Sequence, residues 1–152
     1  MRNYLLTLGL LIFLFTSCNE NRNEIELKMN KVEISMCSIC GWCAGGDSLL
    51  ITQERTYYEL NKQCGEITKN REFETTKKDW DELIELLDKE EFQKIDVNTC
   101  NVCVDGCDTW ITLNDGGNSH TIRFGFNDSL SIAKIQPFID KLEEIKAKID
   151  LQ

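Results

Sequence analysis

Proline and histidine are scarce in this sequence and basic residues are outnumbered by acidic ones, and each of these features excludes some classes of protein. One proline, Pro137, and one histidine, His120, occur in 152 residues. The formal net charge of −9 argues against a nucleic-acid partner, because phosphate recognition needs a basic surface. Any Ser-His-Asp or Cys-His catalysis would have to use His120, and no nucleophile elbow precedes it. No phosphate-binding glycine loop follows a predicted strand, so we favour a function without catalysis.

The chain does have enough apolar sequence for one domain, together with an unusual number of cysteines. Hydrophobic residues make up 41% of it, which argues against a disordered protein. Eight cysteines are many for this length but too few to replace a hydrophobic core. The length fits a single domain.

The first eighteen residues carry the clearest functional signal. Arg2 provides a positive charge, Tyr4–Phe15 is an apolar run too short for a comfortable membrane span, and Phe15-Thr16-Ser17-Cys18 ends in two small residues and a cysteine. These features resemble the lipobox signal of bacterial lipoproteins, with Phe15 where leucine is usual. The resemblance implies that residues 1–17 are a cleaved signal peptide. It also implies that Cys18 carries palmitate-type acyl chains, which anchor the protein to a membrane.

The domain organisation and the localisation follow from this resemblance. Residues 18–23 would be the lipidated cysteine and a polar tether reaching at most about 18 Å, and residues 24–152 a single disulfide-stapled domain. Asn19 is not the aspartate that marks inner-membrane retention in lipoproteins, which implies the outer membrane of a bacterial envelope rather than the inner one. We expect a membrane partner through the lipid, and an envelope protein or a small molecule as the ligand.

Hydrophobic alternation predicts several strands after the tether. Between Ala44 and Ser48 we expect a loop, and the segment Glu66–Glu74 stays open, with Ile67 and Phe73 consistent with a further strand. The predicted strands are one or two within Ile25–Met36, a hairpin of Leu49–Thr52 and Thr56–Leu60, a short strand ending at Val97, and a hairpin of Thr109–Asn114 and Ser119–Phe126 that turns at Asp115-Gly116-Gly117-Asn118.

Two amphipathic helices complete the predicted fold. Lys77–Lys89 follows a capping-box pattern and places Trp80, Leu83, Ile84 and Leu87 on one face. A C-terminal helix has Phe138, Leu142, Ile145 and Ile149 on one face and Pro137 in its first turn. The fold class is therefore α+β: an antiparallel sheet built from hairpins, with two amphipathic helices packed on one face. Because Cys37-x-x-Cys40 and Cys100-x-x-Cys103 each precede a hairpin and a helix, a degenerate two-fold repeat stays open.

Structural disulfides are the favoured interpretation of the seven cysteines that remain after Cys18, because the envelope is oxidising. Residues i and i+3 of a strand lie too far apart to bond, so each CxxC segment must be a turn or reach distant partners. A link between the two clusters would close a loop of about sixty residues, worth about 4 kcal/mol. An odd number leaves one cysteine unpaired. The candidates are Cys37, Cys40, Cys43, Cys64, Cys100, Cys103 and Cys107.

Metal binding is the first alternative for these cysteines. The pairs Cys37/Cys40 and Cys100/Cys103 can supply four thiolates to zinc, with His120 as a further ligand. An oxidising compartment opposes this interpretation, because metal-binding thiols must stay reduced. For His120, a partly buried strand position beside Ile122 is the simpler assignment.

Thiol–disulfide exchange is the second alternative. Cys40-Gly41-Trp42-Cys43 is similar to the C-G-x-C motif of thioredoxin-like proteins, in which a helix starts inside the motif and a cis-proline faces it. Here Ile39 stands where that family has tryptophan, and the sequence indicates no group that would stabilise a thiolate. We therefore predict a membrane-anchored envelope lipoprotein that acts as a binding or scaffolding module, and keep a thiol-based protein as the alternative.

Overall fold

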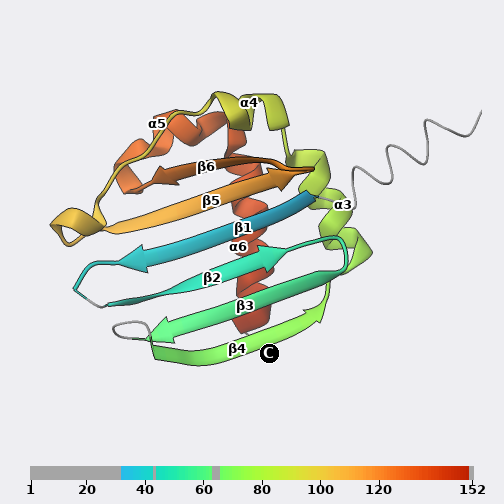
Figure 1. Cartoon of the computed structure of the whole chain (residues 1–152), viewed down its shortest axis with the longest axis horizontal. Helices are drawn as coiled ribbons and strands as arrows, with labels where there is room; N and C mark the ends of the chain where they lie inside the picture. Colours follow the sequence, from blue (N-terminus) through green and yellow to red (C-terminus); the bar gives the residue numbers. More distant parts are fainter. Residues whose placement is uncertain (1–31, 43, 63–65, 151–152) are drawn as a thin grey trace, which may run out of the picture. The chain divides into compact units, whose positions relative to one another are not determined.

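A six-stranded antiparallel sheet with helices against one of its faces forms the described part of the protein (Figure 1). The computed structural model describes residues 32–42, 44–62 and 66–150. The strand order is β4-β3-β2-β1-β5-β6, so β1 lies inside the sheet and joins a four-stranded meander to a hairpin. The elements are β1 (Val32–Cys40), β2 (Gly45–Ile51), β3 (Arg55–Lys62), β4 (Glu66–Glu74), α3 (Lys77–Leu86), α4 (Lys89–Lys94), η2 (Val102–Val104), β5 (Cys107–Asp115), β6 (Asn118–Phe124), η3 (Phe126–Asp128), α5 (Ser129–Ile132), η4 (Ala133–Ile135) and α6 (Gln136–Asp150).

Alternating side chains explain why the strands bury one face only. On β1, Val32, Ile34 and Met36 are buried, and the residues between them are only partly covered. The buried strand residues join Trp80 and Leu83 of α3 and Phe138 and Leu142 of α6 in one core. This is the predicted α+β class, with amphipathic helices on one face of a sheet built from hairpins.

The predicted hairpin turn is confirmed at Asp115-Gly116-Gly117-Asn118. Asp115 pairs with Asn118, and Gly116 and Gly117 have φ angles of 60° and 105°, which favour glycine. The return strand ends at Phe124, however, and not at Phe126. Phe126 begins η3 and is 97% exposed, so its assignment to the return strand was wrong.

The helix predicted at Lys77–Lys89 begins correctly but is shorter. Thr76 caps it by accepting a hydrogen bond from the Asp79 amide. It ends at Leu86, because Asp88 caps a second helix, α4, which directs Phe92 into the core. The short strand predicted to end at Val97 was therefore wrong: part of that segment is helical, and only Asn98 makes an isolated bridge to β6.

The loop predicted at residues 44–48 was also wrong over most of its length. Gly45 and Gly46 belong to β2 and pair with Cys40 and Ile39 of β1. A Cβ atom at Gly46 would lie 2.1 Å from the Ser38 carbonyl oxygen, so these strands approach too closely for any other residue. The segment left open at Glu66–Glu74 is strand β4. Of the one or two strands predicted within Ile25–Met36, the part before Val32 lies outside the described residues, as do Cys18, Cys43 and Cys64.

Candidate functional site

The face of the sheet opposite the helices carries the candidate functional site, and we call it the open face. In Figure 1, α6 crosses behind the sheet, and the open face is turned toward the reader. Its side chains are the alternate strand residues that do not enter the core, including Ser35 and Cys37 of β1, Tyr57 of β3 and Trp110 of β5. A sheet face with exposed aromatic residues is a common place for binding.

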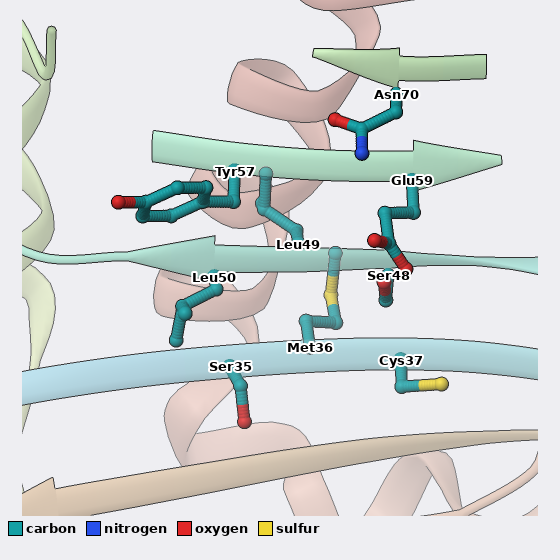
Figure 2. A pocket seen from close by; sticks show the side chains of 9 residues that line it. All are labelled: Ser35, Met36, Cys37, Ser48, Leu49, Leu50, Tyr57, Glu59 and Asn70. Atoms are coloured by element: carbon teal, nitrogen blue, oxygen red, sulfur yellow. The ribbon is translucent and has the colours of Figure 1, made fainter. Parts of the chain in front are cut away.

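A hollow of about 420 Å³ lies on this face over β1 to β4. Figure 2 shows the side chains around it. Leu50 and Tyr57 supply apolar surface, and Tyr57 is 39% exposed. Glu59 is the one charged residue among those that line it. The full lining is Ser35, Met36, Cys37, Ser48, Leu49, Leu50, Tyr57, Glu59 and Asn70.

Cys37 borders the hollow and is the free cysteine among the described residues. Burial raises the pKa of its thiol, and the nearby Asp47 carboxylate raises it further, against a smaller opposing effect of Lys146. The thiol therefore stays protonated at neutral pH, and a protonated thiol is a poor nucleophile and a poor metal ligand.

The other described cysteines form two disulfides. Cys40 and Cys107 are directly opposite each other on β1 and β5; they are 67 positions apart in sequence, and their Cα–Cα distance is 4.0 Å. Cys100 bonds to Cys103, which lies in the short helical turn η2. The two CxxC segments thus take different structures, one in a strand and one in a turn, and do not mark equivalent positions of a repeat.

The structure separates the residues considered for zinc. Cys40, Cys100 and Cys103 are bonded in disulfides. His120 points to the helical side of the sheet, where its Nε2 hydrogen-bonds the Ile95 carbonyl oxygen at 3.0 Å and its ring lies 5.6 Å from that of Phe92. Within the described ranges, no three His, Cys, Asp or Glu side chains come together as a metal site.

In the C-G-W-C segment, Cys40 ends β1, and Gly41 and Trp42 lie in a turn and not in a helix. Ala44 donates its amide hydrogen to the Gly41 carbonyl oxygen at 3.1 Å, and Trp42 has a φ of 54°. Cys40 bonds outside the motif, to Cys107. The local structure that the thioredoxin-like resemblance implied is therefore absent from these described residues.

A second cluster on the open face, which sequence reasoning missed, surrounds Asp108. The Nε and Nη2 atoms of Arg123 donate to Asp108 Oδ2 at 3.1 and 2.6 Å, and the Arg123 guanidinium lies 4.6 Å from the Trp110 ring centroid. The amides of Asn101 and Val102 and the side chain of Asn101 also donate to this carboxylate. Strand alternation places Asp108 and Trp110 on one face, but nothing in the local sequence indicates that Arg123 of the next strand pairs with them.

These contacts set the ionisation of Asp108. Burial would raise the pKa of the carboxyl, but the hydrogen bonds from Asn101, Val102 and Arg123 outweigh burial and lower the pKa to about 2. The carboxylate is therefore charged at any physiological pH. It holds the segment Cys100–Gly106 against the start of β5.

Comparison of the chain with protein families and with curated protein sequences finds no match. Among the helices that the structure describes, none is long and apolar enough to cross a membrane.

Proposed function

We propose that this chain is a lipid-anchored binding protein of the bacterial cell envelope, and that the hollow on the open face binds a small ring-bearing cation. The observation that carries the proposal is the hollow itself, which combines apolar surface with a few polar groups at its border. Small-molecule sites commonly have this composition and volumes of about 300–1,000 Å³. The lipobox-like residues 1–18 support the anchored location.

The lining residues favour this ligand class. Tyr57 and Leu50 offer surfaces on which a ring can pack, and the Glu59 carboxylate attracts a positive charge. Asn70 and Ser48 add hydrogen-bonding groups. The protonated thiol of Cys37 contributes packing surface at the border of the hollow.

Binding can be tested by NMR with a matched pair of probes. Tyramine has a ring and a cation, whereas 4-hydroxyphenylacetate has the same ring and an anion. We expect tyramine to produce saturable amide shifts at Ser48, Leu50 and Tyr57 in residues 19–152, which contain the entire described fold. The anion should produce shifts at least tenfold smaller, and Glu59→Gln should remove the difference.

A blocking variant and its control complete this test. Ser35→Trp places a bulky side chain in the hollow and should abolish the tyramine shifts. Thr121→Trp adds the same side chain to the open face on β6, outside the residues that line the hollow, and should leave the shifts unchanged. Equal shifts from both probes in the wild type, or tyramine binding that survives Ser35→Trp, would contradict the proposal.

Anchoring is tested separately in the full chain. Grown with a palmitate analogue, bacteria that express the protein should label it and retain it in the membrane fraction. Cys18→Ser should remove both the label and the membrane association, because acylation needs the thiol. A variant that still carries the label would show that Cys18 is not the lipidation site.

A further inference from the structure

The Cys100–Cys103 disulfide lies beside a cation and is open to solvent. The Nη2 atom of Arg123 is 2.9 Å from Cys100 Sγ, and both cysteines are exposed. The same nitrogen donates to Asp108, so the guanidinium bridges a carboxylate and a sulfur atom. This is the group able to stabilise a thiolate that the sequence alone did not reveal.

The second disulfide lacks the cation, although its Cys107 is also exposed. Cys40–Cys107 closes a long loop between two paired strands, and no described cation donates to either of its sulfur atoms. Cys100–Cys103 encloses two residues only and therefore constrains little of the unfolded chain. A short, exposed disulfide beside a guanidinium is poorly explained as a structural staple.

We propose that Cys100–Cys103 is a thiol–disulfide exchange site that accepts two electrons from two reduced cysteines of an exported polypeptide. A partner thiolate attacks Cys103 Sγ, so that a partner–Cys103 bond forms, the Cys100–Cys103 bond breaks and the electron pair stays on Cys100 Sγ. The second partner thiolate then attacks the partner's own bonded sulfur. This forms the partner's disulfide and releases the Cys103 thiolate, which takes a proton from water.

The direction of attack follows from the position of Arg123. The better leaving group in thiol–disulfide exchange is the thiolate that is more stabilised. Arg123 donates to Cys100 and not to Cys103, so Cys100 leaves and Cys103 is attacked. Asp108 offsets part of the positive charge of Arg123. Asp128, which accepts a hydrogen bond from the Thr99 hydroxyl, is a second carboxylate near the Cys100–Gly106 segment. Because these carboxylates offset the charge of the guanidinium, Nη2 acts on Cys100 chiefly as a directed hydrogen-bond donor.

Exposed apolar side chains at the same end of the sheet define the partner as an unfolded or extended polypeptide. Trp42 is 83% exposed and Val104 is 77% exposed. Their segments meet where the Gly41 amide donates to the Gly106 carbonyl oxygen at 2.9 Å, and Figure 1 shows the β1–β2 turn and η2 at this end. Apolar segments that flank a cysteine pair in an unfolded chain would pack here.

The reduction rates of the two disulfides in one molecule test the proposal directly. Oxidised residues 19–152 are treated with dithiothreitol, quenched by alkylation at intervals and mapped by peptide mass spectrometry. We expect Cys100 and Cys103 to be reduced at least tenfold faster than Cys40 and Cys107. Arg123→Gln should slow this reduction about tenfold. Arg55→Gln, which removes a guanidinium bound to Glu72 on β3–β4, should not change the rate.

A second variant decides the question even if Arg123→Gln fails to fold. Cys103→Ser leaves Cys100 as a thiol beside Arg123, and the pH dependence of its alkylation gives its pKa. We expect a midpoint at least one pH unit below the ordinary value of about 8.5, with Cys37 of the same molecule above that value. A Cys100 midpoint at or above 8.5, or equal reduction rates of the two disulfides, would overturn the proposal. Neither result depends on the hollow or on the lipid anchor.

Discussion

At the scale of single residues, Asp108 is the side chain on which the Cys100–Gly106 segment depends. It is 1% exposed, and its carboxylate accepts hydrogen bonds from three residues. Replacing it by asparagine keeps the shape but removes the charge that Arg123 and the amides face. We expect Asp108→Asn to lower the free energy of unfolding by about 3 kcal/mol at neutral pH, because it breaks a buried ion pair.

The pH dependence of this loss follows from the lowered pKa of Asp108. Because the folded pKa is about 2 and the ordinary value is 3.8, the carboxylate stabilises the fold fully above pH 4. That contribution is lost as the pH falls toward 2. Urea unfolding should therefore show a difference between the wild type and Asp108→Asn that is large at pH 6 and small at pH 2.5. Asp81→Asn, at an exposed carboxylate, should cost less than about 1 kcal/mol, and an Asp108→Asn loss of equal size at both pH values would refute the argument.

At the scale of secondary-structure elements, a buried lysine joins the two long helices. Lys141 of α6 is 5% exposed and donates to Asp79 and Glu82 of α3 at 3.0 and 2.5 Å, and to Glu144 of its own helix at 3.1 Å. Burial would lower the pKa of Lys141, but these carboxylates hold it well above its usual range. The lysine is therefore charged throughout the accessible pH range and holds α3 against α6.

Removing this charge should weaken the contact between the helices. We expect Lys141→Met to lower the free energy of unfolding by about 2 kcal/mol, because Asp79 and Glu82 lose their buried partner. Lys148→Met is the matched control, since Lys148 also contacts Asp79 and Glu144 but its side chain is 47% exposed, and it should cost less than about 1 kcal/mol. Equal urea midpoints for the two variants would show that burial of Lys141 adds nothing.

The elements that were predicted correctly are those that depend on residues close to one another in the sequence. Alternation on β1, the Gly116-Gly117 turn and the Thr76 cap all depend on neighbours in sequence, and each was predicted correctly. Gly45 and Gly46 were predicted to lie in a loop because consecutive glycines usually do. Their pairing with β1, which the sequence did not indicate, makes them part of a strand. The segment before Val97 was predicted as a strand, because a few apolar residues do not distinguish a helical turn from an extended segment, and the structure instead has α4 there, with Phe92 buried.

The candidate sites were less predictable, because they depend on contacts between distant residues. The hollow needs side chains from four strands, and the cation beside Cys100 comes from Arg123, 23 residues further along the chain. The sequence indicated that a link between the cysteine clusters was geometrically allowed. It could not indicate which cysteines are opposite each other on β1 and β5.

At the scale of the whole molecule, the two disulfides should differ in their effect on stability. The sequence separation is 67 for Cys40–Cys107 and 3 for Cys100–Cys103. Restriction of the unfolded chain grows with the enclosed loop, which gives about 4 kcal/mol for the first and at most about 2 kcal/mol for the second. Urea unfolding of Cys40→Ser/Cys107→Ser and of Cys100→Ser/Cys103→Ser should show this order. A larger loss from the Cys100–Cys103 pair would mean that this disulfide is a structural staple, and would remove the reason for assigning it a chemical role.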